Sequence, residues 1–127
     1  MAKKGSILVV DDQLGVRRLL QELFGEEGFD VLLAGHGGEA LELAKRQTPT
    51  LALVDVKMPV MDGLETLRAL KQVYPDLPVV MMTAVGDGER VAEALKSGAL
   101  KAITKPFDVF AVRTMVLDLI QDRSPKC

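Results

Sequence analysis

Short apolar runs separated by amphipathic segments predict a chain of alternating strands and helices. Residues 7–10, 51–54 and 78–82 are apolar at every position. Runs of this length without alternation are typical of strands that are covered on both faces of a sheet. The pattern therefore favours a parallel sheet with helices on both sides.

Apolar residues between these runs recur with the spacing of amphipathic helices. The clearest series follows the i, i+3, i+4, i+7, i+8 pattern and predicts one buried helical stripe. Its members are Val16, Leu19, Leu20, Leu23 and Phe24. Two further sets mark helix ends, namely Gly28 and Gly98 as left-handed C-terminal residues and Asp62 and Asp108 as N-terminal caps. Helix ends and apolar spacing thus predict the same boundaries.

The sequence predicts five strands and five helices in strict alternation. Strands are expected near residues 6–10, 29–34, 51–54, 78–82 and 101–104. Helices are expected near residues 14–27, 37–46, 63–73, 88–97 and 108–122. Alternation of this kind builds an α/β sandwich in which right-handed crossovers join parallel strands.

Composition excludes several classes of protein. The chain has 127 residues, 48% hydrophobic and 27% charged, which is the balance of one folded domain. A net charge of −2, with four Phe, one Tyr and no Trp, argues against direct nucleic-acid binding. No apolar stretch approaches the ~20 residues of a membrane span. The single cysteine, Cys127, suits a reducing compartment. We therefore expect one cytoplasmic domain over residues 1–127 with no output domain.

Polar residues follow four predicted strands at the point where each strand ends. Asp11 and Asp12 follow the first, Asp55 the third, Thr83 the fourth and Lys105 the fifth. Because ligands bind at the carboxyl ends of strands in open parallel sheets, these residues are expected to meet on one rim. Two carboxylates about 4 Å apart repel by roughly 4 kcal/mol at an effective dielectric of about 20, which favours cation binding. Mg²⁺ takes oxygen ligands of this kind.

The same rim favours phosphoryl chemistry. A phosphoryl group moving onto a carboxylate needs its equatorial oxygens held and neutralised, and a metal ion, the Lys105 ammonium and the Thr83 hydroxyl can do this. An ionised aspartate can act as nucleophile without a general base. Asp55 is the candidate, because it stands alone at the end of a central strand.

Ordered motifs resemble the receiver domain of two-component response regulators over essentially the whole chain. They are Val10-Asp11-Asp12, Val54-Asp55-Val56-Lys57-Met58-Pro59, Met61-Asp62-Gly63, Met82-Thr83-Ala84 and Lys105-Pro106-Phe107. The chain is most similar to single-domain receivers of sporulation phosphorelays through Asp11-Asp12-Gln13, Gly15-Val16-Arg17, the Asp55 motif and Gly98-Ala99-Leu100. The resemblance implies a flavodoxin-like (βα)5 fold with a parallel sheet of order 2-1-3-4-5.

The resemblance also implies a phosphoacceptor site with bound Mg²⁺. Asp55 would accept a phosphoryl group from the phosphohistidine of a histidine kinase, and the chain would relay it to a phosphotransferase. Asp12, Asp55 and the Lys57 carbonyl would bind Mg²⁺, and Asp11 would act through a metal-bound water. The implied protein is not an enzyme, apart from Mg²⁺-dependent self-phosphorylation and slow autodephosphorylation.

Two further rim residues have implied roles. Lys105 would contact the phosphoryl oxygens, and the Lys105–Pro106 bond would be cis. Thr83 would bind the phosphoryl group after transfer and pull the following loop inward. Small Ala84 would leave the phosphate accessible.

Three positions bear on how this receiver would pass on its signal and how fast it would lose its phosphoryl group. Many family members carry Tyr or Phe three residues before the lysine, whereas this chain has Ala102. A rotating aromatic switch is therefore excluded there, which favours a relay over an output switch. Neither Lys57 nor Val85, two residues after Asp55 and Thr83, can orient an attacking water, so slow self-dephosphorylation is expected.

The resemblance places the partner surface beside the acidic rim. A helical phosphohistidine domain is expected to dock through Gln13, Leu14, Gly15, Val16, Pro106 and Phe107. Leu14 lies off the helical stripe and is the first residue to test. We expect a monomer that binds neither nucleic acid nor membrane directly.

Other functions fit the sequence less well. The chain could be a receiver that acts by phosphorylation-dependent protein contact, or one cut from a longer regulator with a DNA-binding or enzymatic output domain. A flavodoxin-type electron carrier would need hydroxyls and amides where the first loop is acidic. A phosphatase that uses two aspartates two residues apart is also disfavoured, because the residue two positions after Asp55 is Lys57. His36 is interpreted as a loop residue without a partner.

Overall fold

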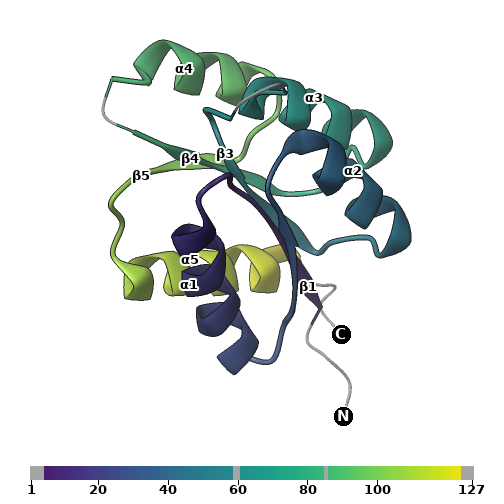
Figure 1. The fold of residues 1–127 in the computed structure, drawn as a ribbon, viewed down its shortest axis with the longest axis vertical. Helices are drawn as coiled ribbons and strands as arrows, with labels where there is room; N and C mark the ends of the chain where they lie inside the picture. The colour runs from purple at the N-terminus through teal and green to yellow at the C-terminus, as the bar shows by residue number, and fades with distance from the viewer. Residues whose placement is uncertain (1–4, 59–60, 85, 124–127) are drawn as a thin grey trace.

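A five-stranded parallel sheet lies between two layers of helices (Figure 1). The computed structural model describes residues 5–58, 61–84 and 86–123, with side chains as far as residue 121. The strands are β1 (Ser6–Val10), β2 (Asp30–Ala34), β3 (Leu51–Asp55), β4 (Val79–Thr83) and β5 (Lys101–Thr104). The helices are α1 (Leu14–Glu26), α2 (Gly37–Arg46), α3 (Gly63–Val73), α4 (Gly88–Lys96) and α5 (Val109–Arg123). Each boundary lies within one residue of its predicted position.

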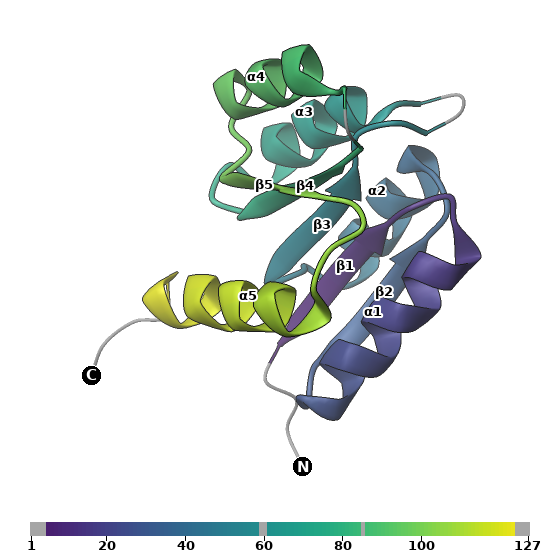
Figure 2. The ribbon, with the colours of Figure 1, turned by 90° about the vertical axis from the view of Figure 1, so that its left-hand side faces the viewer.

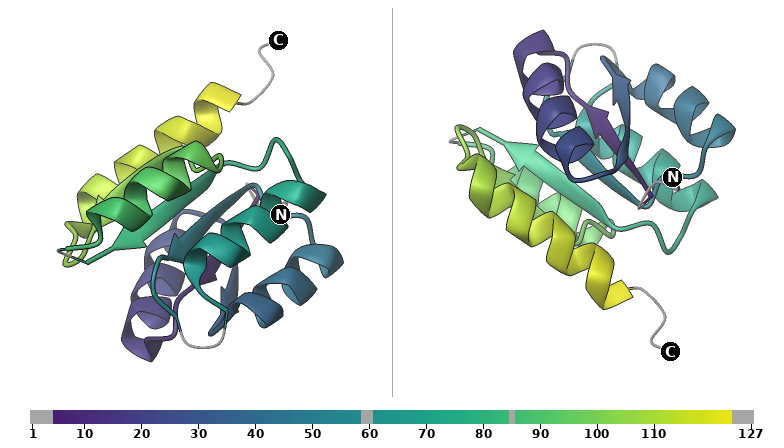
Figure 3. Two further views of the ribbon diagram at one scale, coloured as in Figure 1. Left: turned by 90° about the horizontal axis from the view of Figure 1, so that it is seen from above. Right: turned by 90° about the horizontal axis from the view of Figure 1, so that it is seen from below.

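The strand order is β2-β1-β3-β4-β5, which confirms the predicted doubly wound fold. Helices α1 and α5 cover one face of the sheet, and α2, α3 and α4 cover the other (Figures 2 and 3). Pro59, Val85 and Cys127 lie outside the described residues. Within the described part of the chain, no helix is long and apolar enough to cross a membrane.

The central strands are apolar throughout because both of their faces are buried. On β1, Leu8 and Val10 pack into the cluster beneath α2, α3 and α4, whereas Ile7 and Val9 pack against α1 and α5. Side chains of a strand alternate between the two faces of a sheet, so covering both faces removes the polar alternation. This arrangement leaves chemistry to the strand ends.

Helix α1 has a narrower buried face than its spacing predicts. Leu20 and Phe24 are fully buried, but Leu19 is 42% exposed, so the prediction that Leu19 belongs to the buried stripe is wrong. At about 100° per residue, Leu19 points about 120° away from the midpoint of Leu20 and Phe24. Helix α1 lies against an edge of the sheet, and that side remains in solvent.

Helix termini follow the predicted chemistry with one exception. Gly28 and Gly98 have φ values of 96° and 110°, and Asp62 and Asp108 accept hydrogen bonds from backbone N–H groups of the helices that follow them. The interpretation of His36 as a residue without a partner is wrong. Its Nδ1 accepts a hydrogen bond from the first turn of α2, so His36 is a helix cap.

Candidate functional site

The candidate site lies on the rim where the carboxyl ends of the central strands meet. Strands β1 and β3 are neighbours, and Val10 is opposite Val54. Asp11 and Asp55 are each the next residue along, so the pairing of two buried strands places their side chains next to each other. Asp11 is held further by a backbone hydrogen bond of 3.0 Å from its N–H to Ala34.

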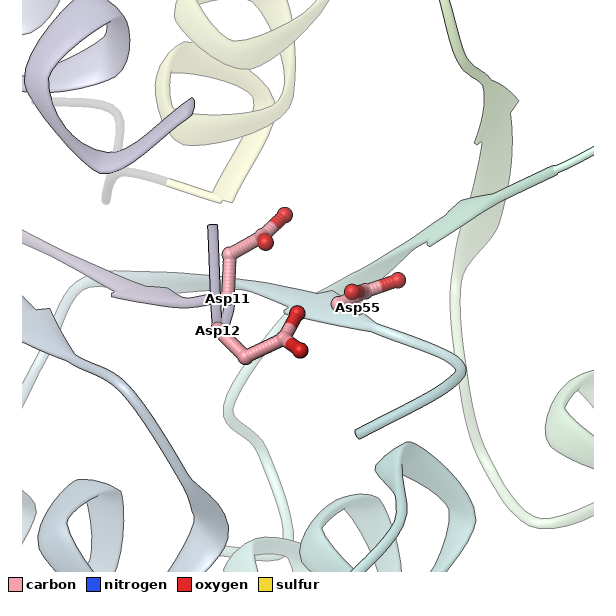
Figure 4. A group of neighbouring side chains, drawn as sticks. All are labelled: Asp11, Asp12 and Asp55. Carbon is pink, nitrogen blue, oxygen red and sulfur yellow. The ribbon is translucent and has the colours of Figure 1, made fainter. Parts of the chain in front are cut away.

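Three carboxylates form one cluster at this rim. Asp11, Asp12 and Asp55 each offer an oxygen atom, and these atoms all lie within 4.8 Å of one another (Figure 4). Asp11 and Asp55 are buried, whereas Asp12 is exposed. Oxygens on opposite sides of a Mg²⁺ ion are separated by about 4.2 Å, since each Mg–O bond is about 2.1 Å long. The size and chemistry of the cluster therefore suit a hard divalent cation.

Lys105 is the cation that the protein itself brings to this cluster. Its Nζ lies 2.6 Å from Asp11 Oδ2 and 3.5 Å from Asp55 Oδ2. The Nζ also donates a hydrogen bond of 3.1 Å to the side chain of Gln13. Lys105 follows β5 and precedes a cis peptide bond to Pro106, as predicted. One ammonium group is thus shared between the two buried acids.

The charge of Asp55 is set by competing neighbours. The pKa of Asp55 is raised to about 6, chiefly by burial and further by the nearby Asp11 carboxylate. The Lys105 ammonium and a hydrogen bond from the Lys57 backbone N–H lower the pKa but do not cancel the first two effects. A cation bound beside Asp55 would favour its ionised form. Asp55 is therefore a carboxylate whose reactivity depends on what binds next to it.

Thr83 ends β4 on the same rim, and its hydroxyl is bonded to the neighbouring strand β5. The hydroxyl donates a hydrogen bond of 3.3 Å to the carbonyl oxygen of Ile103. The backbone N–H of Ala84 donates to Asp87 at 2.8 Å. Contact between Thr83 and a group on Asp55 would therefore require the hydroxyl to leave Ile103.

Gly63, the first residue of α3, packs closely against the backbone at the end of β3. A Cβ atom at this position would collide with the carbonyl oxygen of Asp55 and lie 2.7 Å from the Cα of Val56. The Gly63 N–H also donates to the Val56 carbonyl at 2.9 Å. The glycine that follows Asp62 is thus required for the first turn of α3 to approach the end of β3.

The candidate partner residues surround the rim. Leu14 is 52% exposed, and Gln13, Gly15 and Pro106 are also exposed. Val16 and Phe107 are half-buried and pack against the apolar cluster beneath α1 and α5. Gln13 has a second role that its sequence position does not reveal, because its side chain contacts Lys105.

Sequence reasoning missed two residues that contact the rim. Arg17 donates a hydrogen bond of 2.7 Å to the Asp11 carbonyl oxygen. Asp87 is 5% exposed and lies 3.2 Å from Lys57 through its Oδ1 atom. An aspartate four residues after Thr83, directly before a predicted helix, was a visible signal for Asp87. An aspartate at this position is also typical of an ordinary helix cap, so the sequence does not indicate that Asp87 contacts Lys57 in another loop.

Comparison with known proteins identifies the family. Residues 7–117 match the response regulator receiver domain. The chain is 41% identical over 110 residues to sporulation initiation phosphotransferase F of Bacillus subtilis, covering 87% of this chain and 89% of that protein. It is 38% identical over 120 residues to the regulatory protein AtoC of Escherichia coli, covering 94% of this chain but 26% of AtoC.

Solved structures agree with this assignment. A CheY-like receiver domain protein from Methanospirillum hungatei superposes with a TM-score of 0.89 at 27% identity, covering 96% of each chain. The receiver domain of NtrX from Brucella abortus superposes with a TM-score of 0.85 at 32% identity, covering 93% of this chain and 99% of that one. Family match, relatives and fold all agree, and the chain belongs to the response regulator receiver domain family.

Proposed function

We propose that this chain is a stand-alone receiver that accepts a phosphoryl group on Asp55 from a sensor histidine kinase and relays it to a histidine phosphotransferase. The observation that carries the proposal is the buried Asp55 carboxylate, 3.5 Å from the Lys105 ammonium and clustered with Asp11 and Asp12. Receiver domains are phosphoacceptor signalling domains, which gives this arrangement its chemical meaning.

The transfer forms one bond and breaks another at phosphorus. A carboxylate oxygen of Asp55 attacks the phosphorus of a phosphohistidine, and the bond from phosphorus to the imidazole nitrogen breaks as the acyl phosphate forms. The imidazole takes up a proton from solvent as it leaves. Lys105, whose Nζ is 3.5 Å from Asp55 Oδ2, is proposed to neutralise charge on the equatorial oxygens, and the Thr83 hydroxyl is proposed to bind the phosphoryl group after transfer.

The carboxylates of Asp11, Asp12 and Asp55, with the Lys57 carbonyl, are the groups proposed to hold Mg²⁺. When bound, Mg²⁺ supplies positive charge that offsets the repulsion between the acids and the incoming phosphoryl group. Asp11 already has Lys105 as a direct partner at 2.6 Å, which supports a metal contact through water for this residue. The exposed Asp12 is free to contact the ion directly.

Two features support a relay in which the phosphoryl group persists. Ala102 provides no ring that could move when Thr83 moves. The Lys57 ammonium is occupied by Asp87 and offers no base for an attacking water, so slow self-dephosphorylation is proposed. The likeness to sporulation initiation phosphotransferase F over 89% of that protein favours a relay, and a role in sporulation, over other receiver outputs.

A second candidate is a receiver that controls an output by protein contact. The chain spans only 26% of AtoC and 23% of ZraR from Escherichia coli, which are longer regulators. Leu95, Leu100 and Phe110 are large exposed apolar side chains near β5 and would suit such a contact. We propose the relay first, together with a single cytoplasmic domain that acts as a monomer and binds neither nucleic acid nor membrane.

Acceptor and relay are tested in two steps. Wild type and Asp55→Asn are incubated with acetyl phosphate and Mg²⁺, and intact mass is measured. Wild type is expected to gain one phosphoryl mass and Asp55→Asn none; no gain by wild type contradicts the acceptor role. Phosphorylated wild type is then mixed with a purified histidine phosphotransferase domain. Loss of the group to water without transfer to histidine contradicts the relay and favours the contact function.

A further inference from the structure

Three of the five described helices begin directly after an aspartate, and one of these aspartates does not cap its own helix. Asp62 accepts a hydrogen bond of 3.0 Å from the N–H of Glu65 in α3. Asp108 likewise accepts from backbone N–H groups in the first turn of α5. Asp87 precedes α4 but makes no side-chain cap hydrogen bond there. Its carboxylate is used elsewhere.

Asp87 joins the two loops that follow β3 and β4. Its Oδ2 accepts a hydrogen bond of 2.8 Å from the N–H of Ala84, the residue after Thr83. Its Oδ1 lies 3.2 Å from Nζ of Lys57, two residues after Asp55. The Asp87 side chain is 4% exposed, whereas that of Lys57 is 64% exposed. The hydrogen bond from Ala84, with help from Lys57, lowers the pKa of Asp87 below its usual value.

Little else fixes the start of α4. All nine residues of α4 are described, and only Ala94 among them is buried. Arg90 lies 3.8 Å from Asp62 and Arg68 lies 3.1 Å from Glu93, but exposed pairs of this kind stabilise weakly. Asp87 is therefore the main polar contact between the start of α4 and the rim.

Phosphorylation would act against this contact. The acyl phosphate replaces the single charge of the Asp55 carboxylate with about two negative charges on the phosphoryl oxygens, a net gain of about one, and these oxygens compete with Asp87 for the nearby Lys57 ammonium. Movement of the Thr83 hydroxyl from Ile103 toward Asp55 would carry the adjoining Ala84 with it and disturb its hydrogen bond to Asp87. The contacts of Asp87 therefore favour the arrangement without a phosphoryl group.

We propose that Asp87 is a positioning residue for the phosphoryl chemistry of Asp55, which it restrains through Lys57 and the backbone of Ala84. This inference rests on the proposed acceptor role of Asp55. A ligand that requires a less populated arrangement binds more weakly by the fraction of molecules that adopt it. Removing the charge of Asp87 should therefore strengthen binding of a phosphoryl mimic.

The test compares binding of beryllofluoride, a mimic of the phosphoryl group, in the presence of Mg²⁺. Asp87→Asn keeps the shape of the side chain and an oxygen that can accept from Ala84, but it loses the charge that pairs with Lys57. The apparent Kd, followed by ¹⁵N NMR, is expected to be about two to five times lower than that of wild type, the size of effect expected for loss of one partly exposed ion pair. Glu93→Gln, which removes the pair with Arg68, is the matched control and should bind as wild type does.

A double-variant cycle separates a positioning role from a general structural one. Lys57→Met keeps the backbone carbonyl but removes both the partner of Asp87 and the ammonium that would move toward the phosphoryl mimic, so in this background Asp87→Asn should leave the apparent Kd unchanged. This inference alone is overturned if wild type and Asp87→Asn bind beryllofluoride equally. It is also overturned if Asp87→Asn lowers the apparent Kd by the same factor with and without Lys57→Met. Failure of wild type to bind beryllofluoride overturns the acceptor role and this inference with it.

Discussion

Nζ of Lys105 lies 2.6 Å from Oδ2 of Asp11, although 94 residues separate the two in sequence. The Asp11 side chain is fully buried and that of Lys105 is 18% exposed. The contact joins the end of the first strand to the end of the last strand across the sheet. It makes the neutralisation of a buried carboxylate depend on a side chain from the edge of the fold.

We predict that Lys105→Met destabilises the metal-free protein. The substitution leaves Asp11 buried without a cation, and removing one partner of a buried ion pair costs about 3 kcal/mol. Urea unfolding in the presence of a chelator measures this change in the free energy of unfolding. Lys101→Met, at an exposed position in β5, should change it by less than about 0.5 kcal/mol. Equal losses of unfolding free energy in Lys105→Met and Lys101→Met would refute the claim that Lys105 neutralises the buried Asp11.

The stability of the metal-free protein should depend on pH through Asp55. Its pKa is about 6 in the folded protein and 3.8 for an unperturbed aspartate, so between these values the folded state binds more protons than the unfolded state. The protonated Asp55 carboxyl therefore contributes its full share of the unfolding free energy below about pH 4, and this contribution is lost as the pH rises through 6. Relative to Asp55→Asn, wild type should lose about 2 to 3 kcal/mol of unfolding free energy from pH 4 to pH 7.

Chemical unfolding at several pH values, for both proteins in a chelator, provides the measurement. Added Mg²⁺ at pH 7 should reduce the difference, because a cation offsets the charge of ionised Asp55. Parallel curves for wild type and Asp55→Asn would show that burial does not perturb this carboxyl group.

Gly63→Ala should damage the site through the backbone. The new Cβ would collide with the Asp55 carbonyl oxygen, so the first turn of α3 must move away from β3. We expect a loss of about 2 kcal/mol or more in unfolding free energy and slower labelling by acetyl phosphate. Gly25→Ala, in α1 with open space around the added atom, should instead stabilise by about 0.5 kcal/mol. Normal labelling of Gly63→Ala would contradict this close approach.

Leu14→Glu should impair transfer between proteins while sparing chemistry at Asp55. Leu14 is 52% exposed beside the rim, and a buried charge in a docking interface costs affinity. Transfer from a phosphorylated histidine domain is expected to slow at least about tenfold, with labelling by acetyl phosphate unchanged. Val73→Glu is a matched control, because Val73 is also 52% exposed but ends α3. Unchanged transfer by Leu14→Glu would remove α1 from the docking surface.

Element boundaries and rim residues could be predicted because they depend on local chemistry. Residues that continue buried strands must lie at the sheet's end, so the sequence alone is enough to place Asp11 and Asp55 together. The exposure of Leu19 depends on how far the sheet extends beneath α1, which spacing alone does not encode. The contact of Asp87 with Lys57 depends on the rotamers of two side chains from different loops, and the sequence suggests only a cap.

The residues of the rim come from strands that differ in how well their backbone amides are protected from solvent exchange. Asp11 and Asp55 extend from the interior strands β1 and β3, while Lys105 extends from β5, an edge strand whose residues are exposed apart from the half-buried Ile103. Backbone amides of interior strands open only with the whole domain, whereas an edge strand can open locally. We therefore expect the backbone amides of β1 and β3, which carry the acids, to exchange more slowly than those of β5, which precedes the lysine that neutralises them.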